Sequence, residues 1–365
     1  MKNGRRLLVT LAMVLILVAT ACGGPSTPAP TAKPPAQKFT VMWSVYVGWM
    51  PWPYAQESGI LKKWADKYNI VIDLKRADYI PSIEAYVAGQ ADAVVMTNME
   101  ALNMAAAAGI DSTAIIIGDY SNGNDAVLTR NGLTLPELKG KKVSIVELSV
   151  SQFLLERGLE EEGKGVKVTD MTLVNTSDAD IGPAFISDAS QVALVSWNPI
   201  VLDVLTQVTK VTNAFNSSKI PHEILDVMFV RTEVLNKNPN LAKALTGAWY
   251  ETMRVMTTKD PARDKALEAM AKESGTTLAS YNKQLETTFM YWLPKNAATF
   301  TQSPKLVEVM DLVRKFSFDH GLWTGAKTVD EIGIEFPGAK TLGDAKHIGL
   351  RFTDTYMQMA ADGKL

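Results

Sequence analysis

Short apolar strands alternate with helices through most of this chain, and that alternation restricts its fold more than any other feature. Runs rich in β-branched and apolar residues predict strands at 39–46, 70–74, 93–96, 113–118, 126–129, 142–146, 171–174, 192–196 and 227–230. Helices are predicted between them, at 53–68, 81–88, 100–108, 152–162, 181–186 and from Pro199 onward. Beyond residue 230 the pattern predicts mostly helices, at 241–257, 264–273, 281–289 and 304–320. Strand–helix alternation followed by helices indicates an α/β protein with parallel-rich sheets flanked by helices and with additional C-terminal helices.

The first residues of the chain are predicted to be a targeting segment. Three basic residues within the first six positions precede the apolar run Leu7–Val18, which is shorter than the ~20 residues of a membrane span. Small residues then lead to Cys22, the only cysteine. This resembles a bacterial lipoprotein signal, with residues 1–21 removed and Cys22 lipidated. The alternative is an ordinary signal peptide in which Cys22 is incidental.

Residues 22–37 are rich in Pro, Ala and Thr and show no apolar periodicity, so they are predicted to form an extended tether. More than 300 residues follow, enough for a sizeable core and two lobes. A single cysteine excludes an intramolecular disulfide. The predicted signal holds three of the 37 Lys and Arg residues and none of the 39 acids, so the mature chain has a net charge of about −5. This charge does not favour nucleic-acid binding.

An aromatic cluster begins the folded part of the chain. It comprises Trp43, Tyr46, Trp49 and Trp52, on a stretch interrupted by glycine and prolines. In open α/β sheets, ligands bind at the carboxyl ends of the strands, and this cluster follows the first predicted strand. The rings are therefore candidates for one wall of a binding site.

Polar side chains and one further tryptophan follow the other strands, and they are the remaining candidates. They are Asp78, Asn98, Glu100, Asp125, Ser149, Ser151, Trp197 and Asn198. These turns contain several acids and no Lys or Arg, because Arg76 and Arg130 stand on the strand side of their turns. Aromatic faces and carboxylates together suit a small organic cation. Free amides at the helix start near Ser149 keep an anion possible.

Most of these residues also have a purely structural explanation. Trp43 could equally pack in the core, and Glu100 could be an acid favoured by the helix dipole. Helix capping or a place in a turn would explain Asp78, Asp125, Ser149 and Ser151. An enzyme is not predicted: the three histidines show no metal-ligand spacing, and neither a G-x-S-x-G motif nor a phosphate loop is found. No catalytic residue, metal or cofactor is therefore expected.

Five short motifs resemble the extracytoplasmic solute-binding proteins of ABC importers, in the nitrate, sulfonate and taurine group. They are 89–95 (GQADAVV), 138–143 (LKGKKV), 151–159 (SQFLLERGL), 195–199 (VSWNP) and 229–239 (FVRTEVLNKNP). The resemblance implies a two-lobe, type II periplasmic-binding-protein fold that closes on its ligand. Lobe 1 would comprise residues 38–125 and 230–365, and lobe 2 residues 126–229. It also implies a monomer that works with a permease and an ATPase while anchored by lipid outside the cell membrane.

Two segments, 43–53 and 316–322, resemble the branch of this group associated with urea carboxylase genes and guanidine uptake. The resemblance to this branch implies that the rings of the aromatic cluster form the walls of the ligand pocket. It also implies that Asp78, Asn98, Glu100 and Trp197 supply polar contacts or close the pocket over the ligand. Asn198 stands where other branches often have an acid. The predicted ligand is guanidinium, which is planar and permanently charged. The alternatives are a small anion, if Arg76 or Arg130 points into the cleft, and urea or a pyrimidine-type compound.

Overall fold

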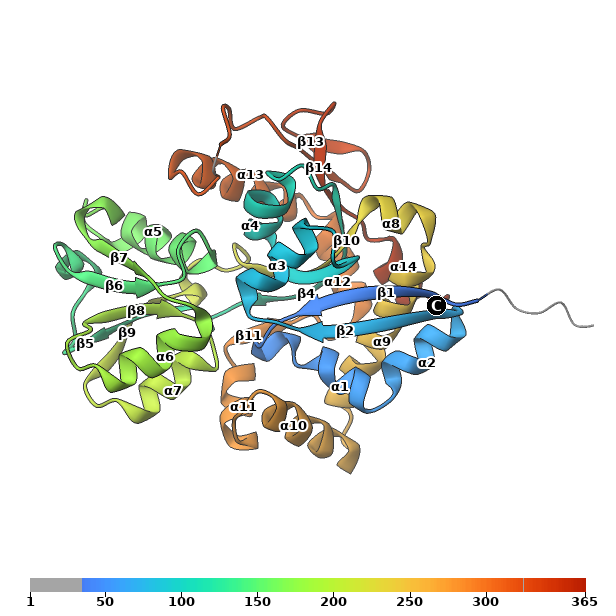
Figure 1. Ribbon diagram of the computed structural model, residues 1–365, viewed down its shortest axis with the longest axis horizontal. Helices are drawn as coiled ribbons and strands as arrows, with labels where there is room; N and C mark the ends of the chain where they lie inside the picture. The colour runs from blue at the N-terminus through green and yellow to red at the C-terminus, as the bar shows by residue number, and fades with distance from the viewer. Residues whose placement is uncertain (1–34, 324) are drawn as a thin grey trace, which may run out of the picture. The chain divides into compact units, whose positions relative to one another are not determined.

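The computed structural model describes residues 35–323 and 325–365, and Ala36–Leu365 form one compact unit (Figure 1). The predicted signal peptide, the lipidation site Cys22 and nearly all of the predicted tether lie outside the described residues. Within the described ranges, no helix has the length and apolar character needed to cross a membrane.

A large mixed sheet contains both the first and the last strand of the described chain. Its strand order is β13-β12-β14-β4-β10-β3-β1-β2, and β11 pairs with β4. The bounds are β1 Gln37–Trp43, β2 Ile70–Arg76, β3 Ala93–Thr97, β4 Ser112–Ser121, β10 Leu225–Arg231, β11 Thr288–Met290, β12 Gly333–Phe336, β13 Lys340–Leu342 and β14 Ile348–Phe352. Strand β1 is parallel to β2 and β3, whereas β10 is antiparallel to both of its neighbours.

A smaller sheet is formed by the middle of the chain, drawn in green in Figure 1. Its order is β7-β6-β8-β5-β9, with bounds β5 Ala126–Arg130, β6 Lys142–Ile145, β7 Thr172–Asn175, β8 Ala193–Ser196 and β9 Val211–Asn216. The chain passes between the sheets after β4 and again after β9. Strand β10 pairs with β3 and β4 along its length, so residues 225–229, which the sequence assigned to the second lobe, belong to the large sheet.

Helices flank both sheets, as the apolar periodicity predicts. The bounds are α1 Pro51–Glu57, α2 Ile60–Lys67, α3 Tyr79–Val87, α4 Asn98–Glu100 with a π-helical continuation Ala101–Ala106, α5 Val150–Glu162, α6 Asp178–Ser187, α7 Ile200–Gln207, α8 Thr232–Lys237, α9 Asn240–Thr257, α10 Pro261–Glu273, α11 Leu278–Leu285, α12 Pro294–Gln302, α13 Pro304–Asp319 and α14 Thr355–Ala361. Short 3-10 turns form at Val47–Trp49, Leu135–Leu138, Val168–Asp170 and Ser217–Lys219.

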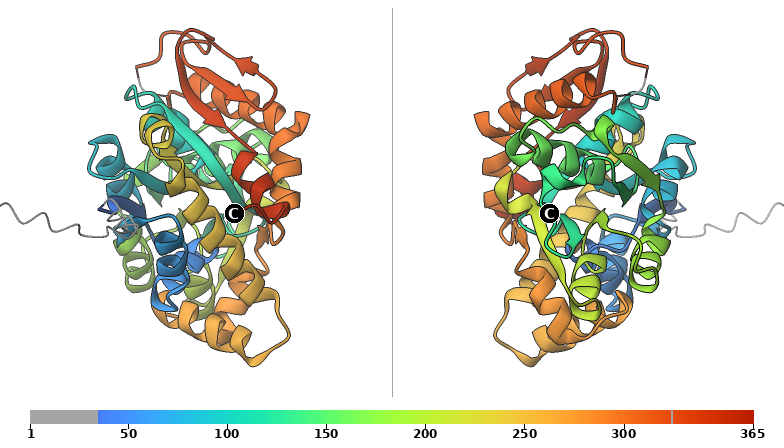
Figure 2. Two further views of the ribbon diagram at one scale, coloured as in Figure 1. Left: turned by 90° about the vertical axis from the view of Figure 1, so that its right-hand side faces the viewer. Right: turned by 90° about the vertical axis from the view of Figure 1, so that its left-hand side faces the viewer.

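The structure differs from the predicted elements at three places. The predicted helix 53–68 is two helices, because Gly59 has a φ of 80° and interrupts it. The C-terminal region is not only helical: β12, β13 and β14 extend the large sheet and lie beside α13 (Figure 2). In addition, no strand was predicted at residues 211–216, where β9 forms. Strand β9 has one fully buried residue among six, and β13 has three residues of which none is fully buried, so their sequences show little apolar periodicity.

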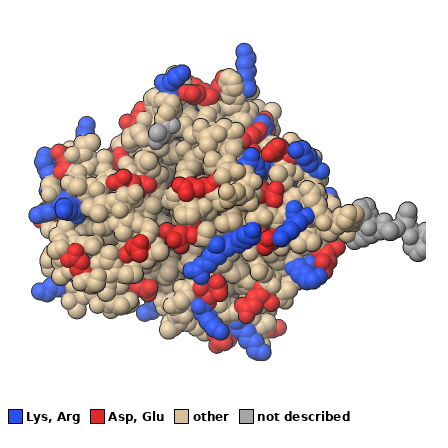
Figure 3. All heavy atoms as spheres, viewed as in Figure 1, with Lys and Arg blue, Asp and Glu red and all other residues tan. Residues whose placement is uncertain are grey.

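Charged side chains are interspersed on the face drawn in Figure 3, with Lys and Arg next to Asp and Glu. The main apolar core lies in and around the large sheet, where β3, β4 and β10 are almost wholly buried. Strands buried on both faces read as continuous apolar runs, which explains why the sequence located them well.

Candidate functional site

A small pocket lies where segments of the large sheet meet α5 and the turn after β8. It is lined by Tyr46, Trp49, Tyr79, Thr97, Asn124, Asp125, Val150, Trp197, Ile224 and Asp226, and the space between their atoms is about 260 Å³ with open solvent included. The pocket is therefore small, and in this conformation it could admit at most a molecule of a few heavy atoms.

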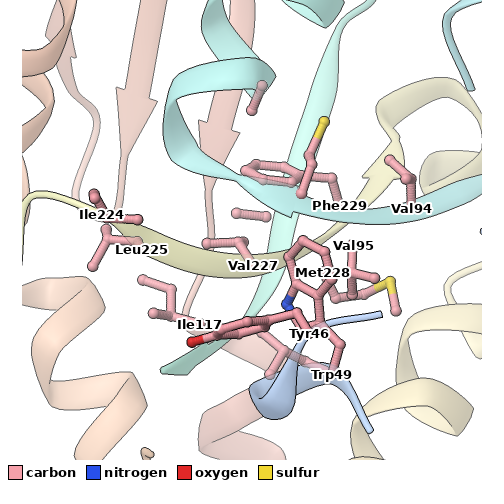
Figure 4. Close-up of a cluster of buried hydrophobic side chains, with 14 of the residues drawn as sticks. Tyr46, Trp49, Val94, Val95, Ile117, Ile224, Leu225, Val227, Met228 and Phe229 are labelled. Carbon is pink, nitrogen blue, oxygen red and sulfur yellow. The ribbon is translucent and has the colours of Figure 1, made fainter. Parts of the chain in front are cut away.

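Four aromatic rings contact one another along the pocket. The centroids of Tyr46 and Trp49 are 5.1 Å apart, those of Trp49 and Tyr79 are 5.6 Å apart, and those of Tyr79 and Trp197 are 5.5 Å apart. Figure 4 shows Tyr46 and Trp49 beside apolar side chains of β10. The Trp197 ring nitrogen donates to the carbonyl of Val45 at 3.4 Å, which connects the turn after β8 to the turn after β1. The Trp49 ring nitrogen is buried without a partner.

Four buried carboxyl groups surround these rings. Asp125 and Asp226 line the pocket, while Asp119 and Glu100 lie behind it. The exposed fractions of the four residues are 0% for Glu100 and Asp119, 4% for Asp125 and 5% for Asp226. The residues that line the pocket include no Lys, Arg or His. Buried acids without a basic partner are costly, which makes this cluster the most unusual electrostatic feature of the described chain.

Asp125 is held in place by hydroxyl and amide donors. Its Oδ2 accepts hydrogen bonds from Ser121 Oγ at 2.5 Å and Asn124 Nδ2 at 3.4 Å. Burial raises the pKa of Asp125 to about 6 despite these bonds, because the ionised form loses its hydration. At neutral pH this carboxyl group is therefore mainly ionised.

Asp119 and Asp226 face each other across β4 and β10 as partners in the strand register. Tyr46 donates to Asp119 Oδ1 at 2.7 Å, and Asp119 Oδ2 is buried without a hydrogen-bond partner. Burial raises the pKa of Asp119 to about 7. Burial, and after it the charge of Asp119, raise the pKa of Asp226 well above its usual value. Two acids in contact resist simultaneous ionisation, so this pair retains a proton near neutral pH.

Glu100 links the large sheet to the first residue of α5. Its Oε1 accepts a hydrogen bond of 2.6 Å from the backbone nitrogen of Val150. Its Oε2 accepts from Tyr79 OH at 2.8 Å and from Thr97 Oγ1. Burial raises the pKa of Glu100, and these hydrogen bonds partly oppose that rise. The carboxylate thus occupies the position at the start of α5 where an external anion would bind.

Four predicted site residues line the pocket, namely Tyr46, Trp49, Asp125 and Trp197. Glu100 does not line the pocket, but it accepts hydrogen bonds from three residues that do, Tyr79, Thr97 and Val150.

The other predicted residues lie outside the lining, each for a local reason. Trp43 packs beneath Arg76, whose guanidinium carbon is 5.9 Å from the ring centroid. Trp52 packs against Trp249, with 5.0 Å between ring centroids. Asp78 precedes α3 without capping it, because Asp178 Oδ2 accepts the hydrogen bond from Tyr79 N.

The predicted amide and hydroxyl residues stabilise turns. Asn98 accepts from Leu225 N at 2.9 Å and donates to the carbonyl of Glu223, which fixes the start of β10. Ser149 caps α5 by accepting from Ser151 N at 3.1 Å. The Ser151 hydroxyl is buried without a partner and does not line the pocket. Asn198 donates to Thr287 Oγ1 at 3.0 Å and accepts from Leu202 N.

The sequence placed Tyr79, Thr97 and Asp119 directly after predicted strands but did not select them as site residues, and it did not identify Asp226 or Asn124. Asp226 lies at the start of its strand, and ligands were expected after strand ends. Because β10 runs antiparallel to its neighbours, its first residues lie at the same edge as the last residue of β3. Knowing that β10 reverses direction would have revealed Asp226.

The two arginines proposed as anion contacts are engaged elsewhere. Arg76 is half exposed and lies 3.6 Å from Glu273. Arg130 donates to the carbonyls of Phe185 and Gln191 and stacks on the Phe185 ring. Within the described ranges, no group of three or more His, Cys, Asp and Glu side chains is arranged to hold a metal ion.

Comparisons with known proteins agree with this geometry at the level of family and fold. A family model described as NMT1/THI5 like matches residues 69–263, more than half of the chain. A sequence search finds no matching relative among curated proteins. The aliphatic sulphonate-binding protein of Escherichia coli has a similar structure, with a TM-score of 0.64, 17% identity, and coverage of 79% of this chain and 94% of that one.

Two further solved structures are similar. The nitrate-binding protein of Synechocystis PCC 6803 has a TM-score of 0.57 and 11% identity, with coverage of 90% of this chain and 99% of that one. A Candida albicans protein described as having the generic periplasmic binding protein fold has a TM-score of 0.59 and 12% identity, with coverage of 80% and 92%. The fold is therefore the predicted α/β periplasmic-binding-protein fold.

Proposed function

The chain belongs to the NMT1/THI5-like family, and from this we propose that it is the extracytoplasmic solute-binding component of an ABC importer and that its ligand is guanidinium. Similar structures belong to periplasmic proteins that bind aliphatic sulphonates and nitrate. We propose the same transport role for this chain, with a ligand of opposite charge.

The observation that carries the proposed ligand is a small pocket walled by rings and acids and lacking any basic side chain. Each aromatic face attracts a desolvated cation by ~0.5–2 kcal/mol. Guanidinium is planar, keeps its charge at all relevant pH values, and donates in fixed directions. It would stack on Trp49 or Tyr79 and direct N–H groups to Asp226 and Asp125. The proposed roles of Tyr46 and Trp197 are to close the ring wall.

A small anion is the competing ligand, because the similar solved proteins bind sulphonate and nitrate. The helix start that could receive an anion is already paired with Glu100, and Arg76 and Arg130 make other contacts. Urea has the shape of guanidinium but would leave the carboxylates without a counter-charge. A pyrimidine-type heterocycle is disfavoured by the small volume of the pocket.

We propose that the ligand is captured by closure of two lobes, residues 38–125 with 230–365 and residues 126–229, with β10 assigned to the first. Contacts that join the two proposed lobes include those of Glu100 to Val150, Trp197 to Val45, and Asn198 to Thr287. Each would break if the lobes separated. These contacts support the proposal that the pocket belongs to the closed form.

We also propose that Cys22 carries a lipid anchor and that a permease and an ATPase receive the ligand. Replacing Cys22 with serine should move the protein from the membrane fraction to the soluble fraction of the producing cell. Membrane retention of that variant would remove lipidation from the proposal.

Calorimetry and thermal unfolding with matched small ligands test the function. Millimolar guanidinium chloride should raise Tm clearly, whereas urea, nitrate and taurine at the same concentration should not. Potassium chloride controls for ionic strength. Equal shifts with guanidinium and urea, or a shift with an anion alone, would overturn the cation assignment. A guanidinium-specific heat of binding in titration calorimetry would support it.

A further inference from the structure

Asp119 and Asp226 are buried acids at paired positions of β4 and β10, with exposed fractions of 0% and 5%. Asp119 Oδ2 has no hydrogen-bond donor among the described residues. Two neighbouring buried acids resist simultaneous ionisation. The pair is therefore expected to hold one proton when the pocket is empty.

The groups that face this pair do not neutralise it. Tyr46 donates to Asp119, and Thr288 lies 3.1 Å from the Tyr46 hydroxyl. The other charged or titratable neighbours that act on the pair are Asp125, Tyr79, Tyr281 and Tyr291. All of these are acids or neutral phenols. A positive charge can therefore reach the pair only as a proton or as a ligand.

Gly48 restricts the space around Asp119 on the other side. A Cβ at Gly48 would lie 2.5 Å from Asp119 Oδ2 and 2.5 Å from the Tyr46 ring. The backbone at this glycine thus packs directly against the carboxyl group. Asp226 lines the pocket and Asp119 does not. The pair has one side open to ligand and one side closed by the chain.

We infer that Asp119 and Asp226 hold an exchangeable proton, and that guanidinium displaces it from the pair when it binds. This rests on the proposed function. The O–H bond of the pair breaks, the proton leaves to solvent, and N–H donors of the ligand take its place against Asp226. One positive charge enters as one leaves, so the net charge of the closed pocket is unchanged. In this proposal Asp119 does not contact the ligand, and it acts as a positioning residue for Asp226.

Proton displacement makes binding depend on pH although the ligand itself does not titrate. Release of one proton per ligand strengthens binding about tenfold per pH unit. Burial raises the pKa of Asp119 to about 7 and that of Asp226 well above its usual value, so the dependence is expected around neutral pH. Asp125, with a pKa raised to about 6, contributes only at lower pH.

A pH-stat titration tests the inference directly. Full-length protein in unbuffered potassium chloride at pH 7.5 receives guanidinium chloride, and the base needed to hold the pH is measured beside calorimetric binding. We expect close to one equivalent of base per bound ligand, with Kd falling between pH 7 and pH 8. Binding without base consumption and with a constant Kd would overturn the inference and leave the proposed function intact. Absence of guanidinium binding would overturn both.

Two isosteric variants locate the proton. Asp119→Asn removes one acid of the pair, so base consumption should fall well below that of the unmodified protein, and the pH dependence of Kd should flatten. Asp125→Asn is the matched control, which should weaken binding yet keep the proton release at pH 7.5. Unchanged release in Asp119→Asn would contradict the inference. If Asp119→Asn does not fold, the measurements on the unmodified protein and on Asp125→Asn still decide.

Discussion

Asp226 combines three properties that no other residue of the site shares. It lines the pocket, it is almost fully buried, and it pairs with a second acid rather than with a base. None of the residues that line the pocket is basic. A cation that enters the pocket would therefore supply the opposite charge for this carboxylate. Asp226 is the second residue of β10, and its backbone is held by pairing with both neighbouring strands.

Asp226→Asn should therefore weaken guanidinium binding strongly while leaving the fold intact. A hydrogen bond to a charged partner is worth about 1.5–3 kcal/mol, so Kd should rise roughly 10- to 150-fold. Asp78→Asn makes the same chemical change outside the pocket lining and should leave Kd unchanged. Titration calorimetry measures both. An unaltered Kd in Asp226→Asn, or an equal loss in Asp78→Asn, would remove Asp226 from the proposed contacts.

The sequence predicted the aromatic cluster as part of a binding site, but it could not tell which of the four rings line the pocket. Four rings within ten residues predicted a wall of a binding site, and two of them, Tyr46 and Trp49, line the pocket. Trp52 is directed to Trp249 instead. The turn Val47–Trp49 and helix α1 decide which rings face the pocket, and a partner some 200 residues away decides where Trp52 packs. Neither is visible in a local sequence pattern.

Helix α5 begins beside the pocket, and its first amide is bound by the carboxylate of Glu100 rather than left free. The positive end of a helix attracts anions, so Glu100 acts as an internal anion. In the proposed function this carboxylate excludes external anions and adds negative charge behind the pocket.

Glu100→Ala should free the Val150 amide, weaken guanidinium binding and allow weak nitrate binding that the unmodified protein lacks. Glu100→Gln is the control, because it keeps an oxygen available to Val150 and should not bind nitrate. Nitrate-dependent shifts in Tm and titration calorimetry measure the outcome. Nitrate binding by the unmodified protein, or by the Gln variant as strongly as by the Ala variant, would contradict this role for Glu100.

The elements that the sequence predicts best are those that the core buries most. Strands β3, β4 and β8 are continuous apolar runs, and each was predicted close to its observed bounds. The sheets were predicted to be parallel-rich, but the reversed direction of β10 was not predicted, because apolar content carries no information about the partner strand. The error at β10 therefore concealed Asp226, and the short strands after α13 were missed because their pairing is set by distant residues of β4 and β14.

Over the whole molecule, the buried acids link folding stability to pH. Burial raises the pKa of Glu100, Asp119, Asp125 and Asp226, to about 7 for Asp119 and about 6 for Asp125. A carboxyl group with a raised pKa binds its proton more tightly in the folded chain than in the unfolded chain. Its effect on stability is therefore most favourable below the unfolded pKa of about 4 and becomes unfavourable as pH rises towards the folded value.

Ligand-free protein should accordingly lose stability between pH 5 and pH 7.5, on the order of a few kcal/mol, and its Tm should fall by several degrees. Saturating guanidinium should reduce that fall, because it stabilises the ionised acids. Calorimetric scans at matched ionic strength, with potassium chloride as the control salt, measure both curves. Exposed acids with lowered pKa, such as Asp73 and Asp170, act in the opposite direction, but below about pH 4. A Tm of the ligand-free protein that rises from pH 5 to pH 7.5 would contradict the prediction, since no other group in the pocket supplies the missing charge.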